Sequence, residues 1–244
     1  MSDSEVVASM IRNHPGDELL SSYSAGSLPL GQALCVSIHS EFCTNCRKKL
    51  KRFSQVGGEL MLRLNRATVS LDLKNTILNK IDEDSDSLER DHQDMSYSGK
   101  NKVSNVRSGA GESSVPRGLR QFVKSDYQEM PWRRVAKSIH NIELFKDDEN
   151  TKVEILKIKS GGSVTTHFHL GDEYTVILEG SFSDEDGLYQ QGDFLVRNSW
   201  DEHTPVATQD RDCICLAVSE APLQFAGFFK RLLNPLIRLS YSQN

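Results

Sequence analysis

The sequence predicts two domains, a small all-α domain followed by an all-β barrel. Two observations lead to this fold class. In the first part of the chain, apolar residues recur at helical spacing with charged residues between them. In the later part, short runs rich in β-branched residues are separated by Gly, Asp and Asn. We expect four regions: a helical domain over 1–81, a flexible linker over 82–118, a barrel domain over 119–225 and an amphipathic tail over 226–244.

Proline and glycine mark the ends of the expected helices. The stretch "HPGDELLSSYSAG" opens with a proline followed by acidic residues, which suits a helix N-terminus, and Gly26 suits its end. Pro29 can open a second helix through "LGQALCVSIHSEF". Later helices are indicated by apolar stripes, which consist of Leu50, Phe53, Leu60 and Leu64, and then of Leu73, Ile77 and Ile81.

A region that cannot build a core separates the two domains. Residues 82–118 are rich in Asp, Ser, Gly and Asn, so they bury too little surface to offset the entropy of ordering. The strands expected after it include "KVEILKIKS", "EYTVILEGSF", "GDFLVRNS" and "RDCICLAVS", which predict a barrel or sandwich. The tail is apolar and basic, and it either packs on the barrel or contacts a partner.

Composition limits the functional classes. The chain has 244 residues and a net charge of −5, which argues against electrostatic capture of nucleic acid by the whole protein. No stretch approaches the ~20 apolar residues of a membrane span. The start, "MSDSEVVASM", lacks the pattern of a secretion signal, so we expect a cytoplasmic protein. Five cysteines then suggest thiols or metal ligands rather than a disulfide framework.

The first candidate metal site lies in "HSEFCTNCRKK". His39 and Cys43 are four positions apart and share one helix face, and Cys43 and Cys46 form a Cys-x-x-Cys hook. A structural zinc ion takes four ligands, and His14 at the mouth of the first helix is the expected fourth. Cys35, one turn before His39, is the fallback ligand.

Two other interpretations of this segment remain open. The cysteines could form a redox pair, although such pairs usually lie in a strand–helix setting, or all four residues could be unmetallated. We favour zinc because the helical domain has a small core, to which a structural ion adds folding energy. The basic run at residues 47–52 is either the solvated side of a helix or a contact for an acidic partner.

The second candidate metal site lies in "GGSVTTHFHLGDEYTVILEG". Alternation along a strand places His167 and His169 on the same face, and Glu173 begins the next strand. His203 supplies a third imidazole from the later segment "GDFLVRNSWDEHTPV". Such a site of three His and one carboxylate suits zinc, manganese, iron or nickel.

The spacing of this second group is similar to the two cupin motifs. Every defined position of the first motif is matched, by Gly161, His167, His169, Glu173 and Gly180. The second motif matches at Gly192 and His203 but departs at Asn198, Trp200 and Ala207. The resemblance implies a cupin barrel, which is a double-stranded β-helix or jelly roll.

The first group resembles the signature of the zinc-binding anti-sigma factors of bacteria. His14 followed by His39 and its His-x-x-x-Cys-x-x-Cys run carries this resemblance, and "HPGDELLSSYSAGSLP" is similar to the ChrR-type branch. The resemblance implies a helical domain that clamps an extracytoplasmic-function sigma factor, with "LDLKNTILNKI" as its fourth helix. It also implies a C-terminal cupin whose zinc site takes part in sensing singlet oxygen or organic peroxide.

Cys213 and Cys215 point the same way along one expected strand. They are either small buried apolar residues or thiols near the cupin metal that oxidise on the signal, and we favour the first because buried thiols are poor nucleophiles. ChrR-type members carry a similar pair.

We therefore expect a cytoplasmic anti-sigma factor that is not an enzyme, does not bind DNA directly and has no membrane span. The main alternative is a metal-dependent cupin enzyme, dioxygenase-like, with an accessory zinc domain. A flexible acidic linker favours a sensor that repositions over such an enzyme. A DNA-binding zinc protein is a third class, which predicts salt-dependent binding to duplex DNA.

Overall fold

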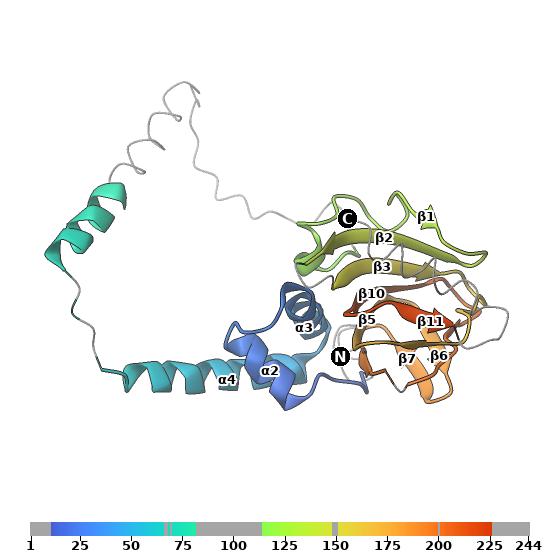
Figure 1. Ribbon diagram of the computed structural model, residues 1–244, viewed down its shortest axis with the longest axis horizontal. Helices are drawn as coiled ribbons and strands as arrows, with labels where there is room; N and C mark the ends of the chain where they lie inside the picture. Colours follow the sequence, from blue (N-terminus) through green and yellow to red (C-terminus); the bar gives the residue numbers. More distant parts are fainter. Residues whose placement is uncertain are drawn as a thin grey trace, which may run out of the picture. The chain divides into compact units, whose positions relative to one another are not determined.

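A computed structural model describes residues 11–65, 68, 70–81, 114–147, 151–199 and 201–225. The predicted tail, most of the predicted linker and Trp200 lie outside these residues. Helices come first and an antiparallel β-barrel follows, as predicted (Figure 1). The helical elements are α2 (Asp17–Ser24), α3 (Leu30–Phe42), α4 (Thr44–Leu62), a helix over 71–81 and the 3₁₀ turn η1 (Arg117–Leu119).

Helix ends follow the expected signals. Two acidic residues, Asp17 and Glu18, occupy the first turn of α2, where the helix dipole favours negative charge. Gly26 follows this helix with φ of +71°, a conformation that glycine adopts at no steric cost. Pro29 directly precedes α3. The chain leaves the helical conformation at Cys43 and re-enters it at once in α4, which turns the two helices away from each other.

The strands form three antiparallel sheets. The largest has the order β1-β2-β3-β10-β5-β8, and the smaller ones are β11-β4 and β7-β6-β9. The strand bounds are β1 (Arg133–Arg134), β2 (Ile139–Lys146), β3 (Lys152–Ile158), β4 (His167–His169), β5 (Glu173–Glu179), β6 (Ser181–Asp184), β7 (Gly187–Gln190), β8 (Phe194–Arg197), β9 (Val206–Ala207), β10 (Cys213–Ser219) and β11 (Leu223–Phe225).

The large sheet is apolar on both faces. Along β10, Ile214, Leu216 and Val218 join a core shared with the helices, whereas Cys213 and Cys215 join the core inside the barrel. The first of these cores also contains the buried α3 residues Leu34, Cys35, Val36 and Ile38. Helix α3 therefore covers the outer face of the sheet, on β5 and β10 (Figure 1).

The helix–barrel contact is tight at one glycine. A side chain at Gly31 in α3 would place its Cβ 2.8 Å from Val218 and 2.9 Å from Val153. Such distances fall inside van der Waals contact, so the absence of a side chain lets α3 lie directly on the sheet.

The contacts divide the chain into two compact units. One comprises the described parts of residues 1–58 and 113–244, and the other those of residues 59–112. Residues 114–118, which composition places at the end of the linker, pack against α3 in the first unit. Val115 is 2% exposed, and the carboxylate of Glu41 accepts the N–H groups of Arg117 and Gly118.

Candidate metal centres

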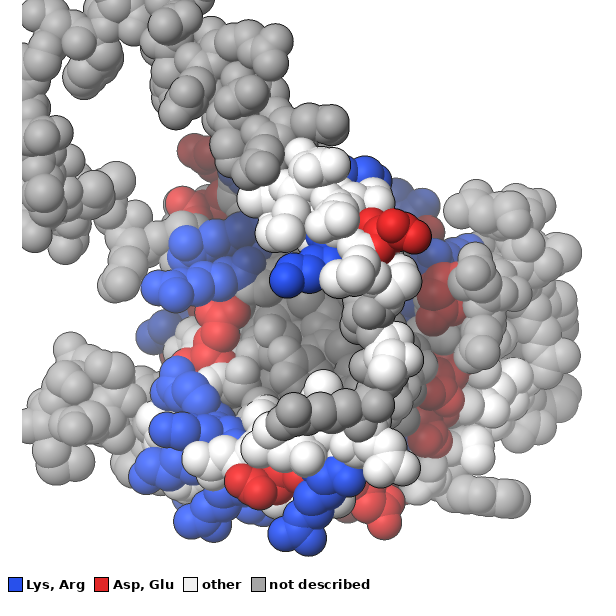
Figure 2. Space-filling model, turned by 90° about the vertical axis from the view of Figure 1, so that its left-hand side faces the viewer, with Lys and Arg blue, Asp and Glu red and all other residues white. Residues whose placement is uncertain are grey.

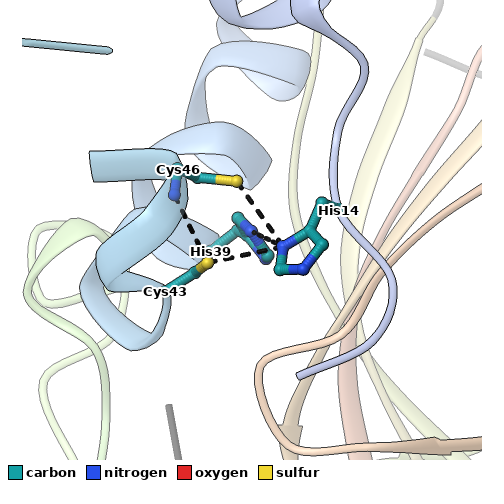
Figure 3. A group of neighbouring side chains, drawn as sticks. All are labelled: His14, His39, Cys43 and Cys46. Carbon is teal, nitrogen blue, oxygen red and sulfur yellow. Dashed lines mark hydrogen bonds between the residues drawn. The ribbon is translucent and has the colours of Figure 1, made fainter. Parts of the chain in front are cut away.

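The four residues predicted as zinc ligands lie together (Figure 3). This helical cluster consists of His14, His39, Cys43 and Cys46, whose ligand atoms all lie within 4.8 Å of one another. The Nδ1 atom of His14 lies 3.4 Å from His39 Nε2, 3.4 Å from Cys43 Sγ and 3.6 Å from Cys46 Sγ. Two imidazoles and two thiols are the donor set of a closed tetrahedral zinc site.

Local structure explains why these side chains meet. His39 lies in the last turn of α3, and the N–H of Cys43 donates to its carbonyl at 2.8 Å, which places the two side chains on one face. Cys46 follows in the first turn of α4, and its N–H approaches the Cys43 sulfur at 3.4 Å. His14 comes from the segment before α2.

Hydrogen bonding and burial prepare His39 to bind a cation. Its Nδ1 lies 2.7 Å from the carbonyl oxygen of Gly192, which can only accept, so Nδ1 carries the proton and Nε2 presents a lone pair to the cluster. Burial lowers the pKa of His39 to about 4, so the ring is neutral at pH 7. Burial and the nearby Cys43 raise the pKa of Cys46 to about 12, and a divalent ion would reverse that effect by favouring the thiolate.

The structure does not place the fallback residue in this cluster. Cys35 is fully buried, and its thiol lies 3.9 Å from the carbonyl oxygen of Tyr174 on β5. Helix α3 thus points Cys35 at the barrel and His39 at the other three residues of the helical cluster.

The second group of predicted ligands also converges, inside the barrel. This barrel cluster consists of His167, His169, Glu173 and His203. The ligand atoms of its three imidazoles lie within 4.8 Å of one another. Nε2 of His203 lies 3.0 Å from that of His167 and 3.4 Å from that of His169. Glu173 Oε2 lies 3.4 Å from His169 Nε2.

The backbone brings the barrel cluster together from β4, β5 and the segment between β8 and β9. His167 and His169 are the two ends of β4 and face the same way, while Glu173 begins β5. His203 lies outside the regular strands, and its backbone exchanges two hydrogen bonds with His167, at 3.1 Å and 3.2 Å. This bridge delivers the third imidazole despite the departures from the second motif.

The barrel cluster has the electrostatics of a cation site. Nδ1 of His167 donates to the carbonyl of Thr165 at 2.8 Å, so its Nε2 presents a lone pair to the cluster centre. Burial lowers the pKa of His167 to about 4 and also lowers that of His203. Burial alone would raise the pKa of Glu173, but His169, His167 and His203 outweigh burial and lower it. Lowered pKa values favour the neutral rings of His167 and His203 and the ionised carboxylate of Glu173, and these are the forms that bind a divalent metal ion.

A cavity of about 640 Å³ opens beside the barrel cluster. His167, Glu173 and His203 line it, together with apolar side chains such as Leu156, Ile158 and Leu195. A metal ion there would face a space large enough for a small organic molecule.

Cys213 and Cys215, for which the sequence left a redox role open as the less favoured alternative, are both buried. Cys213 is 0% exposed and Cys215 4%, and both side chains lie in the core inside the barrel, where Cys215 also lines the cavity. Burial raises the pKa of Cys213 to about 12 and that of Cys215 well above its ordinary value. Such thiols hold little thiolate at pH 7, which favours the packing role.

Sequence reasoning missed the turn between β7 and β8, which contacts the helical cluster through Gly192. The second cupin motif includes this glycine, but a motif cannot indicate that a helix packs on it. A signal for the packing was present in "CICLAV" and "YTVIL", because strands that are apolar at successive positions are buried on both faces.

The comparisons with known proteins find similar sequences both for the barrel and for nearly the whole chain. Residues 120–223 match the sequence family of the ChrR cupin-like domain. The sequence is 29% identical to the anti-sigma-E factor ChrR of Cereibacter sphaeroides over 229 residues, which cover 94% of this chain and 99% of that protein.

A solved structure shows the same likeness. In the crystal structure of Rhodobacter sphaeroides SigE in complex with the anti-sigma ChrR, one chain is similar to this one with a TM-score of 0.69 and 28% identity, covering 86% of this chain and 100% of that chain. Among the helices that the structure describes, none is long and apolar enough to cross a membrane.

Proposed function

The chain resembles a ChrR-type anti-sigma factor along nearly its whole length, and from this premise we propose that it sequesters an extracytoplasmic-function sigma factor in the cytoplasm. The observation that carries the proposal is the 94% coverage at 29% identity, which includes the helices as well as the barrel. A likeness confined to the barrel would be equally compatible with an enzyme, because cupin barrels host many functions.

Zinc in the helical cluster serves a structural role in this proposal. Four protein ligands leave no open coordination position, and a structural ion of this kind stabilises a small helical fold. The ion holds the segment before α2 and the α3–α4 corner together, so that the helices present a defined surface to the sigma factor.

Exposed apolar side chains support a partner surface on the later helices. Four candidate contacts, Leu60, Leu64, Leu73 and Ile77, are between 50% and 69% exposed. Leu73 and Ile77 lie four positions apart and share one face of the helix over 71–81. Apolar helix faces of this kind are the usual contacts by which one protein grips another.

Basic residues supply a second contact for a partner. The five Lys and Arg side chains of the run over 47–52 are all exposed on α4. Figure 2 shows Lys and Arg gathered along one side of the face that it draws. The positive charge of the run over 47–52 would attract an acidic partner surface and accelerate association.

The barrel cluster acts as the sensor in this proposal. It binds zinc or another divalent transition metal, and an oxidant such as singlet oxygen or a peroxide changes the state of the site. The change weakens the grip of the helices and releases the sigma factor.

Co-expression with a sigma factor encoded beside it tests the proposal. We expect a stable complex of equal stoichiometry that contains two metal ions per anti-sigma chain, one for each cluster. Substituting His167 and His169 together should preserve the complex and reduce the response to oxidant. Loss of the complex in that variant would contradict the division of roles between the two clusters.

A metal-dependent cupin enzyme is the second candidate function. The 640 Å³ cavity beside the barrel cluster favours it, since a substrate could reach the metal there. Turnover of oxygen by the purified chain, loaded with iron or manganese and assayed without a sigma factor, would support this alternative.

A further inference from the structure

The turn between β7 and β8 holds the segment that carries His14. Asp193 in this turn is fully buried. Its Oδ1 accepts the N–H groups of Arg12 and Asn13, each at 2.9 Å, and its Oδ2 accepts the N–H of Gln190 at 2.9 Å. The carboxylate thereby ties the two residues before His14 to the barrel.

The residues on either side of Asp193 also contact the helical cluster. The Gly192 carbonyl accepts the Nδ1–H of His39, and the Phe194 N–H donates to the carbonyl of Asn13 at 3.0 Å. The Phe194 ring lies edge-on to His39 with 5.8 Å between centroids. Gly192 has φ of +90°, and a Cβ there would lie 2.7 Å from Ile11, so this close approach requires glycine.

The far end of β8 contacts the barrel cluster. Arg197 pairs in register with Glu173 on β5. Its Nη2 donates to Asp184 Oδ2 and to the hydroxyl of Tyr189, both at 2.7 Å. The same Asp184 oxygen lies 3.5 Å from Nδ1 of His203. One strand of four residues, about 10 Å long, therefore ends at a ligand support of each cluster.

Helix α3 makes a parallel connection. Cys35 contacts the carbonyl of Tyr174, which follows Glu173 directly in β5. His39, four residues later in the same helix, belongs to the helical cluster. The two clusters thus share supports on both β8 and α3.

We propose that β8, together with the turn before it, couples the two metal centres, so that an ion in the barrel cluster tightens the hold of the helical cluster on its own ion. Residues that hydrogen-bond to metal ligands tune affinity by about 10- to 100-fold. A close-packed strand transmits small displacements rather than absorbing them. This inference rests on the metal assignment of the proposed function but not on the sigma factor.

Cobalt(II) is a suitable probe of the coupling in the full chain without a partner. Two thiolates give bound cobalt a strong charge-transfer absorption, whereas the imidazoles and carboxylate of the barrel cluster do not. Absorption therefore reports the helical cluster alone. We expect the dissociation constant for cobalt in this cluster to rise about tenfold when His167 and His169 are both replaced by Ala.

Asp193→Asn tests whether the turn carries the effect. The amide keeps the size of the side chain. Its NH₂ group is itself a donor, so it cannot accept at least one of the three backbone N–H groups that now donate to the carboxylate. We expect this variant to bind cobalt more weakly in the helical cluster. We also expect that replacing His167 and His169 in this variant changes the cobalt dissociation constant much less than the same replacement does in the native chain. Asp210→Asn is the matched control, because Asp210 is exposed on the same barrel and should leave both quantities unchanged.

Arg197→Lys tests the other end of β8 and serves if Asp193→Asn does not fold. Lysine keeps the charge, but its single nitrogen cannot replace both guanidinium nitrogens, of which Nη2 contacts Asp184 and Tyr189 and Nη1 contacts Asp186. A coupling of unchanged size in either folded variant would overturn the proposal. Cobalt binding without coupling in the native chain would refute this inference alone, whereas coupling without a sigma complex would refute the anti-sigma function alone.

Discussion

The imidazole of His39 donates a hydrogen bond of 2.7 Å to the carbonyl of Gly192, although the two residues are 153 positions apart. One residue belongs to the helical cluster and the other to the turn before β8. Because a histidine ligand is oriented by the bond that its second nitrogen makes, the barrel sets the geometry of a site whose four side chains all come from the helical region.

Substituting one thiol of the helical cluster should remove one metal ion. We expect Cys43→Ala to lose one equivalent of metal, to unfold at lower temperature and to fail to hold a sigma factor, since three ligands cannot close the site. Cys35→Ala is the matched control, because the structure directs Cys35 at Tyr174 instead. For both variants, metal analysis measures the bound ion and gel filtration measures the complex with the sigma factor. Loss of metal from the control would show that Cys35 is a ligand.

Charges on the helix over 71–81 should abolish partner binding. Leu73→Asp with Ile77→Asp places two carboxylates on an exposed apolar face, and burying them against a sigma factor would cost several kcal/mol. Asn75→Asp with Asn79→Asp adds the same charge at the same spacing on another face of this helix. Pull-down of the co-expressed sigma factor should fail for the first pair and succeed for the second. Equal binding by both would exclude this face as the contact.

Two glycine substitutions should change stability in opposite directions. Gly31→Ala forces a methyl group into Val218 and Val153, which we expect to cost about 1–3 kcal/mol. Gly57→Ala in α4 meets no atom within 4 Å and should stabilise by about 0.5–1 kcal/mol, because alanine loses less backbone entropy in a helix. Denaturant unfolding measures both. A neutral Gly31→Ala would mean that α3 does not lie tightly on the sheet.

Acid should destabilise the metal-free chain between about pH 6.5 and pH 4. Burial lowers the pKa of His39 and of His167 from 6.5 to about 4. In this window the unfolded chain binds more protons than the folded chain, so stability present above pH 6.5 is lost as the pH falls. Each pKa unit corresponds to about 1.4 kcal/mol, so each imidazole contributes on the order of 3 kcal/mol.

Unfolding of the chelator-treated protein at a series of pH values measures this dependence. His167→Gln should make the curve shallower, because one of the buried imidazoles with a lowered pKa is then absent. The lowered pKa of Glu173 acts separately, below its ordinary value of 4.5. Stability that is constant from pH 6.5 to pH 4 would contradict the burial of these rings.

Cys213 and Cys215 should resist thiol reagents in the folded chain. Their burial and raised pKa values leave little reactive thiolate, so labelling should proceed only as fast as the barrel opens. Labelling followed by peptide mass spectrometry measures the rate, with added denaturant as the positive control. Rapid formation of a bond between the two sulfurs in the folded protein would favour a redox role instead.

Local patterns were sufficient to predict only part of each set of candidate ligands. Helical periodicity places His39 and Cys43 on one face, and strand alternation places His167 and His169 on another, because both depend only on neighbouring residues. The ends of α2 and α3 follow from Gly26 and Pro29 for the same reason. The order of helices before barrel that the sequence predicts is confirmed by the order of the elements along the chain.

The arrangement of one cluster relative to the other depended on tertiary structure alone. Nothing in the helical segment indicates that Gly192 will meet His39, that Asp193 will hold the chain before His14, or that Cys35 will face Tyr174. Spacing along the chain encodes contacts between close neighbours. Contacts across more than a hundred residues arise only when α3 buries its apolar face on the outer side of the sheet, and this packing determines what the two clusters share.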